Sequence, residues 1–147
     1  YRAMAEDVLT QCFDANLLPR RPADVTKNFK LLGAQSFDAS STKLSNMSIA
    51  QGLHSYGDEA ALVSKLPGHK TVLHDGLTEA MVRFAARYEY ARTVEDMLAR
   101  RWRTLFLDAK LAASLTEPVA QILQEETGQD PQLAAFLDLA KQYQTLP

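Results

Sequence analysis

The sequence predicts an all-α protein, a compact multi-helix bundle with a long irregular connection near residues 17–44. Two observations predict this class. Apolar residues recur with the helical period of about 3.6 over most of the chain. No segment shows a convincing alternation of apolar and polar residues, the pattern of a half-buried strand. We therefore expect helices that bury their apolar faces against one another in one core.

The bulk composition narrows the function classes. The chain has 147 residues, 46% of them hydrophobic and 23% charged, which is typical of one soluble globular domain. Its formal net charge of −2 argues against a general polyanion binder. The single cysteine, Cys12, is expected to be a buried, inert thiol in a reducing compartment. No window holds the roughly 18 to 20 uninterrupted apolar residues of a membrane span.

Residues 1–16 are predicted to form an amphipathic helix. Asn16 can close it in a left-handed conformation, and Pro19 and Pro22 prevent its continuation. The chain opens without Met and inside a helical pattern, so we expect this helix to continue from an upstream element of a longer protein. One face carries Met4, Val8, Leu9, Cys12 and Phe13.

The connection over residues 17–44 is rich in Ser and has no apolar period. We expect it to lie on the surface, with Leu31, Leu32 and Phe37 anchoring it on the core. A connection of this length is unusual inside a compact domain, which favours packing against a partner domain.

Residues 45–147 are expected to form the helical core. A first helix is predicted to end at Gly57, and Asp58 is predicted to cap a short helix through Leu66. The apolar stripe of the first helix, which ends at Gly57, consists of Ile49, Ala50, Leu53 and Tyr56. The loop that follows can include a brief extended piece. No Cys, Asp or Glu completes a known metal spacing with His69 and His74, so we expect no metal site.

The next helices have recognisable first residues. Thr78 is predicted to cap one helix, and Thr93 with Asp96 forms a pattern like a capping box at the start of another. A break is expected near residues 102–104. The two apolar stripes consist of Met81, Phe84, Ala85, Tyr88 and Ala91, and of Val94, Met97, Leu98, Trp102, Leu105, Ala109 and Ala112.

Two further helices are predicted near the end of the chain. Thr116 is expected to cap the first, which Gly128 closes, while Asp130 caps the second with Pro131 at its first position. The stripe of the last helix consists of Leu133, Phe136, Leu137, Ala140 and Tyr143.

Motifs for catalysis or cofactor binding are missing. The glycines never form GxGxxG or the P-loop spacing, and there is no GxSxG, HExxH or CxxC. Neighbouring carboxylates at 95–96 and 125–126 point about 100° apart on a helix, so solvated faces are the better interpretation. By itself the chain is expected not to be an enzyme.

Arginines concentrate in the stretch 87–109, "RYEYARTVEDMLARRWRTLFLDA". Ion pairs one helical turn apart are expected between Glu79 and Arg83 and between Asp96 and Arg100. Arg101 lies close to the apolar stripe, so its guanidinium must snorkel, stack on a ring, or meet a carboxylate and backbone carbonyls. Residues expected to fasten the structure or contact another domain are Arg87, Arg92, Asp96, Arg100, Arg101 and Arg103.

Two other function classes remain in view. One is a free-standing module that binds a protein helix in a groove. The other is a helix-turn-helix DNA binder, which is disfavoured because "TVEDM" would place acidic residues at the start of its recognition helix.

The opening "YRAMAED" and the block from Arg87 to Ala109 together resemble one family. They are similar to the C-terminal helical domain of FAD-dependent, quinone-linked glycerol-3-phosphate dehydrogenase, shared with glycerophosphate oxidases. The shared pattern is R-Y-E-x-A-x-T-x-E-D-x-L-x-R-R followed by F-L-D-A. The chain departs from it at Met81, where the family usually has Glu, and at Trp102, where it often has Thr. The first departure removes a possible ion-pair partner of the arginines.

The resemblance implies that residues 1–147 are one helical domain at the C-terminus of a larger flavoenzyme, with 1–16 leaving the FAD domain. The parent would oxidise sn-glycerol 3-phosphate to dihydroxyacetone phosphate and pass electrons through FAD to a quinone. It would be cytoplasmic and peripheral to the cytoplasmic face of the membrane. FAD and substrate would bind upstream, so this part carries no catalytic, cofactor or metal residue, and no nucleic-acid partner is implied.

Overall fold

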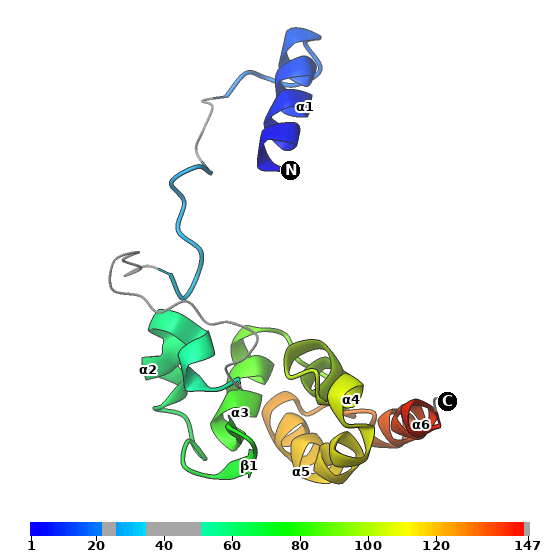
Figure 1. The fold of residues 1–147 in the computed structure, drawn as a ribbon. Helices are drawn as coiled ribbons and strands as arrows, with labels where there is room; N and C mark the ends of the chain where they lie inside the picture. Colours follow the sequence, from blue (N-terminus) through cyan, green and yellow to red (C-terminus); the bar gives the residue numbers. More distant parts are fainter. Residues whose placement is uncertain (22–25, 35–50, 146–147) are drawn as a thin grey trace. The chain divides into compact units, whose positions relative to one another are not determined.

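The computed structural model describes residues 1–21, 26–34 and 51–145. The chain divides into two compact units, Tyr1–Leu31 and Leu32–Pro147, which are described separately. The predicted all-α class is confirmed, because helices dominate both units and the strands of the described part form only one two-stranded hairpin (Figure 1).

The first unit contains helix α1, Arg2–Asp14, which agrees with the predicted helix over 1–16. Asn16 has a φ of 57°, the left-handed conformation that the sequence predicted. None of the side chains of α1 is buried. The prediction of a buried Cys12 is therefore wrong: its side chain is only half-buried. The apolar face of a helix is buried only when another element packs against it, and the first unit contains no second described helix or strand.

The expected anchors of the connection are also wrong where the structure describes them. Leu31 and Leu32 are 75% and 84% exposed. Within the second unit, the backbone carbonyl of Gly33 accepts the amide N–H of Asp58 at 3.0 Å. Phe37 lies outside the described residues.

The first helices described in the second unit are the 3-10 helix η1, Leu53–Glu59, and helix α2, Ala60–Val63. Gly57 interrupts η1 with a φ of 55°, in line with the predicted helix end. The predicted cap at Asp58 is wrong, because that residue lies inside η1 and Glu59 precedes α2 without a side-chain cap. Ile49 and Ala50 fall outside the described residues.

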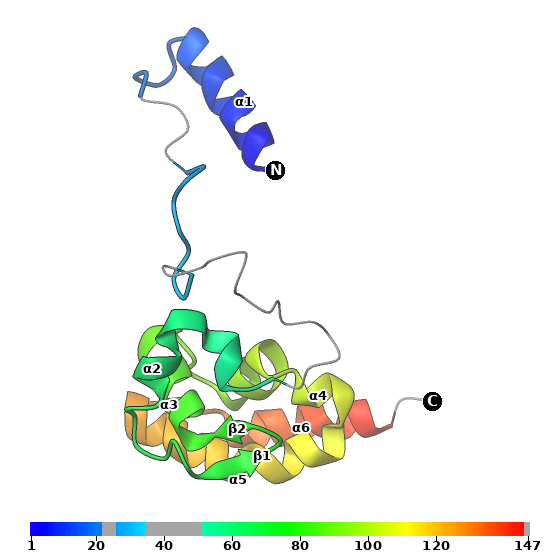
Figure 2. The same ribbon diagram turned by 60° about the vertical axis from the view of Figure 1, so that its left-hand side comes forward.

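The predicted extended piece is a hairpin of strands β1, Val72–His74, and β2, Leu77–Thr78, which pair antiparallel (Figure 2). Gly76, with a φ of 80°, makes its turn. A Cβ at this glycine would lie 2.7 Å from the carbonyl oxygen of Gln51, so the close approach also requires glycine.

Helix α3, Glu79–Tyr88, begins where the sequence predicted. The Thr78 hydroxyl accepts the amide N–H of Met81 at 3.4 Å. Of the predicted stripe, Tyr88 is the exception: its ring is 55% exposed although it packs on Phe84 with centroids 5.0 Å apart. The buried members are Met81, Phe84 and Ala85, with Ala91 just beyond the helix.

The break expected near residues 102–104 is confirmed. A π-helix, η2, spans Asp96–Arg101, and helix α4, Thr104–Leu107, follows it. Between them Arg103 adopts a φ of 60°, a left-handed conformation that is uncommon for a residue with a Cβ.

Helix α5, Ala109–Thr127, is longer than predicted. The predicted cap at Thr116 is wrong, because this residue is fully buried within α5 and its hydroxyl donates to the carbonyl of Ala112 at 3.0 Å. Asp108 caps the helix instead by accepting the amide N–H of Leu111 at 2.9 Å. Gly128 closes it in the left-handed conformation, as predicted.

Helix α6, Leu133–Gln144, begins later than the sequence predicted. The carboxylate of Asp130 accepts the amide of Gln132, but Gln132 has a φ of 57° and is itself the residue that precedes the helix. Pro131 is tied elsewhere, since its carbonyl accepts the amide of Val94 at 3.0 Å. The predicted cap at Asp130 and first position at Pro131 are therefore wrong.

The core of the second unit centres on α5, which packs against α3, α4 and α6 (Figures 1 and 2). Phe84 is 1% exposed, and the ring of Tyr56 meets it edge-on at 5.2 Å. Burial raises the pKa of the Tyr56 hydroxyl, and the nearby Glu89 carboxylate adds to this effect. The arginine-rich stretch 87–109 also contributes to this core, through Ala91, Val94, Met97, Leu98, Ala99 and Leu105.

Candidate functional site

A network of ion pairs among the described residues joins α3 to the end of α5. Arg83 donates to Glu126 at 2.8 Å and to Glu125 at 2.9 Å. Arg87, one turn further along α3, grips both carboxylate oxygens of Glu126 at 2.5 and 2.8 Å. Two parallel contacts of this kind are the strong, geometrically specific form of an arginine–carboxylate pair. The network fastens two helices whose residues lie about forty positions apart.

The side chain of Glu126 is only 9% exposed, and the two arginines have a larger effect on its pKa than burial has. The hydrogen bond from Arg87 lowers the pKa of its carboxyl, and the bond from Arg83 adds to the effect. A hydrogen bond from Arg83 likewise lowers the pKa of Glu125. The pKa values of both arginines are raised, chiefly by their hydrogen bonds to Glu126.

This network corrects two expectations from the sequence. Arg83 was expected to pair with Glu79 and turns to α5 instead. Glu126 was expected on a solvated face and is largely covered.

Asp96 organises the chain between α3 and η2. One of its oxygens accepts the amides of Arg92 and Thr93, both at 3.0 Å. The Thr93 hydroxyl accepts the amide of Asp96 in return at 3.1 Å, which confirms the predicted capping box. Burial by itself would raise the pKa of Asp96, but these donors and Arg100 outweigh it and the pKa is lowered.

Arg100 and Arg101 are both engaged within the domain. Arg100 contacts Asp96 at 2.8 Å, the predicted pair, and also Glu95 at 2.6 Å. Arg101 donates to the carbonyl oxygen of Asp96 at 3.0 Å, to the Glu89 carboxylate at 3.2 Å and to the Glu89 carbonyl oxygen. Of the three environments expected for Arg101, the structure has the carboxylate with backbone carbonyls.

Arg92 is engaged within the domain, whereas Arg103 is not. Arg92 donates to the carbonyl oxygens of Ala86 and Ala91 at 2.8 and 3.2 Å and lies over the Tyr90 ring at 4.2 Å. Arg103 is exposed and makes no ion pair or side-chain hydrogen bond with the part of the chain that the structure describes. The six predicted residues thus lie along one stretch, with five bound internally and one facing outward.

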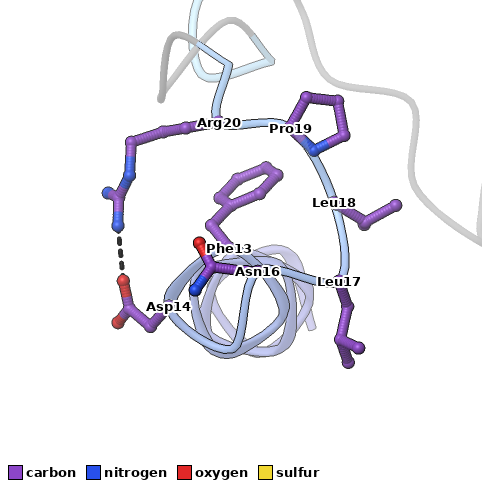
Figure 3. Close-up of a pocket in the computed structure, with 7 residues that line it drawn as sticks. All are labelled: Phe13, Asp14, Asn16, Leu17, Leu18, Pro19 and Arg20. Carbon is purple, nitrogen blue, oxygen red and sulfur yellow. Dashed lines mark hydrogen bonds and ion pairs between the residues drawn. The ribbon is translucent and has the colours of Figure 1, made fainter.

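A shallow hollow lies at the end of α1 (Figure 3). The chain folds back over its last turn, and Arg20 pairs with the carboxylate of Asp14. The guanidinium also lies 6.0 Å from the centre of the Phe13 ring. The lining residues are Phe13, Asp14, Asn16, Leu17, Leu18, Pro19 and Arg20. Because all come from one short segment and the only cation is already paired, this hollow is a local feature of the helix end.

Metal ligands and membrane spans were sought in the same described ranges. No group of three or more His, Cys, Asp or Glu side chains within residues 1–21, 26–34 and 51–145 could hold a metal ion. Among the helices of those ranges, none has the length and apolar character needed to cross a bilayer.

Residues 24–134 match a family described as the C-terminal domain of alpha-glycerophosphate oxidase. The chain belongs to this family. Three relatives are glycerol-3-phosphate dehydrogenases by name: the mitochondrial protein of Arabidopsis thaliana is 31% identical, the probable mitochondrial protein of Dictyostelium discoideum 32%, and the protein of Mycobacterium leprae 30%. The matches cover 86%, 74% and 70% of this chain. No solved structure matches it significantly.

This glycerophosphate oxidase C-terminal family accounts for only part of each relative. The matches cover 24%, 19% and 20% of the three proteins, so the chain spans about a quarter or less of their length. The arginine-rich stretch that carried the resemblance lies inside the matched range. Family membership thus agrees with the resemblance seen in the sequence.

Proposed function

We propose that the chain is the non-catalytic helical domain of an FAD-dependent glycerol-3-phosphate dehydrogenase. The parent protein oxidises sn-glycerol 3-phosphate to dihydroxyacetone phosphate and passes the electrons through FAD to a quinone. The observation that carries this proposal is the family match over residues 24–134, together with relatives of that name that cover most of the chain.

The flavin is proposed to bind in the remainder of the parent protein. The described residues do not fit it: the sequence lacks the GxGxxG turn, and the hollow at the end of α1 offers only a paired arginine. Arg83 and Arg87 already donate to Glu125 and Glu126, so the arginines of this network are engaged within the domain.

The domain arrangement follows from the same proposal. Residues 1–16 leave the FAD domain, and residues 45–147 form the helical unit attached to it. Support comes from α1, whose Met4 and Val8 are 71% and 59% exposed within their own unit. An apolar helix face of this size is normally covered, and the catalytic body of the same polypeptide is the natural cover.

The parent is proposed to be peripheral to the membrane, on its cytoplasmic face, where it can reach a quinone. The named relatives differ in their printed location: those of Arabidopsis and Dictyostelium are called mitochondrial and that of Mycobacterium leprae is not. The chemistry proposed here needs a quinone-containing membrane in either case.

The six residues singled out in the sequence receive two roles in this proposal. Arg87, Arg92, Asp96, Arg100 and Arg101 hold the helical unit together. Arg103, which has no partner among the described residues, is left to contact the catalytic body.

The test uses the full-length protein and the 147-residue chain side by side. The full-length protein should purify with bound FAD and reduce an artificial electron acceptor when given sn-glycerol 3-phosphate. The 147-residue chain should be colourless after incubation with FAD. Stoichiometric flavin on the short chain, or a flavin-free full-length protein that is inactive with this substrate, would contradict the proposal.

A further inference from the structure

Helix α4 presents an exposed apolar surface beside an exposed cation. Phe106 and Leu107 are 52% and 83% exposed, while Leu105 of the same short helix is 2% exposed. Arg103 stands immediately before the helix and is exposed too. We call Arg103, Phe106 and Leu107 the α4 face.

The α4 face is held in place from below. Thr104 and Leu105 are buried in the core, so α4 cannot rotate without losing that packing. The Phe106 ring also meets the Tyr143 ring of α6 at 5.6 Å in an edge-on arrangement. An apolar surface that is fixed before binding loses little conformational freedom when a partner covers it.

Arg103 differs from its neighbours in both charge and backbone. Arg100 and Arg101 are each paired with carboxylates of the domain, whereas Arg103 has no carboxylate partner in the described ranges. Its left-handed backbone, with a φ of 60°, carries strain in a residue with a Cβ. This conformation follows the end of η2, and the carbonyl oxygen of Arg103 accepts the amide N–H of Phe106 at 3.2 Å. The backbone therefore serves the turn from η2 into α4, and it is the exposed guanidinium, without a carboxylate partner in the described ranges, that points to an outside contact.

We propose that the α4 face is the surface through which the helical unit docks on the upstream catalytic portion of the same polypeptide. The partner surface offers an apolar recess for Phe106 and Leu107 and a carboxylate for Arg103. This inference rests on the proposed function only in requiring an upstream portion.

The length of the relatives argues for this occupant. The matches cover a quarter or less of each relative, so most of such a protein lies outside the matched part. A surface on the same polypeptide has a high effective concentration and needs no separate encounter. Phenylalanine and arginine are among the residue types enriched in protein interfaces, and the exposed side chain of Leu107 adds apolar area beside them.

The direct test places a photo-crosslinking amino acid at position 107 of the full-length protein. After irradiation, mass spectrometry identifies the peptide joined to it, and mixing of isotope-labelled and unlabelled copies separates contacts within one chain from contacts between copies. We expect peptides upstream of Tyr1 from the same chain. The matched control is position 72, because Val72 is also an exposed apolar residue, at 61%, but lies on the hairpin. Its yield should be at least several-fold lower.

Each other outcome overturns the proposal. Cross-links to a second copy would make the α4 face an interface between copies, and cross-links to residues 1–50 would make it a surface covered by the chain itself. Equal yields at positions 72 and 107 would show no preferred partner.

A second variant tests the cation. With the crosslinker kept at position 107, Arg103→Glu should lower the cross-link yield several-fold, and Lys70→Glu, an exposed residue of the loop before the hairpin, should leave it unchanged. An unchanged yield with Arg103→Glu would remove Arg103 from the interface. The substrate and flavin assays on the unmodified protein test the proposed function separately, so docking can be upheld where that function fails.

Discussion

Helices α1 and α5 are both amphipathic, yet they differ in how many of their side chains are buried. Helix α5 buries seven of its residues against α3, α4 and α6, whereas α1 buries none within its own unit. The apolar stripe of α5 therefore builds a core, while the stripe of α1 is not covered by residues of its own unit. The comparison teaches that an amphipathic pattern shows which face needs a partner but not where the partner lies.

The arginines differ from one another in a similar way, in whether they find a partner within their own unit. Those of α3 and η2 meet carboxylates or carbonyls of their own unit, and Arg103 meets none among the described residues. The helical unit is thus fastened by its own side chains, whereas the guanidinium of Arg103 faces outward.

The largest expected effect comes from emptying the core of the second unit. Phe84→Ala removes a ring that is 1% exposed and packs on Tyr56 and Tyr88. The free energy of unfolding of the 147-residue chain should fall by about 3–5 kcal/mol. Urea denaturation followed by circular dichroism measures it. A loss below about 1 kcal/mol would mean that this core does not hold the unit together.

Glu126→Gln should have the next largest effect. The substitution removes the charge that two arginines share at a position only 9% exposed. We expect a loss of about 2 kcal/mol in the free energy of unfolding. Glu125→Gln is the matched control: Glu125 is 46% exposed and contacts one of the two arginines, so its loss should be clearly smaller. Equal losses would show that the covered carboxylate has no special role.

The same carboxylates predict a pH dependence. The pKa values of Asp96 and Glu126 are lowered in the folded chain, from ordinary values of 3.8 and 4.5. A lowered carboxyl pKa stabilises the fold above the ordinary value, and this contribution is lost as the pH falls through the folded value. The free energy of unfolding should therefore fall below about pH 4.5. Glu126→Gln should flatten that fall in a urea series at several pH values, and an unchanged slope would contradict the assignment.

The smallest effect is expected in the first unit. Val8→Ser on α1 exchanges an apolar side chain that is already 59% exposed. The unfolding of the helical unit should change by less than about 0.5 kcal/mol, measured by the same urea titration. A loss above about 1 kcal/mol would show that the 147-residue chain already covers α1 on its own.

The parts of the fold that could be predicted from sequence depend on contacts between near neighbours. Thr78 and the pair Thr93–Asp96 cap their helices as expected, because each contact spans three residues. Gly128 closes α5 for the same reason, since a left-handed residue at a helix end is a local requirement.

The failures arise where distant contacts decide. Asp130 followed by Pro131 is a common sequence at the start of a helix. Here the carbonyl of Pro131 accepts the amide N–H of Val94, and α6 begins only at Leu133. Threonine often caps helices, which is why Thr116 was predicted to do so. The packing of the surrounding core instead keeps Thr116 in the interior of α5.

The candidate site shows the same division. The Asp96–Arg100 pair was predictable from its spacing of four residues. The pairing of Arg83 and Arg87 with Glu126 was not, because it depends on how α3 packs against α5. The absence of a partner for Arg103 could not be predicted either, since its neighbours have the same charge and environment in the sequence.

The central claim is that the helical unit builds its own core, whereas we propose that the apolar face of α1 is covered by the upstream portion of the same polypeptide. Hydrogen exchange read by mass spectrometry, on the 147-residue chain and on the full-length protein, tests it most directly. The amides of α3 and α5 should be protected in both, and those of α1 should exchange quickly in the short chain and slowly in the full-length protein. Equal protection of α1 in the two proteins would contradict the claim.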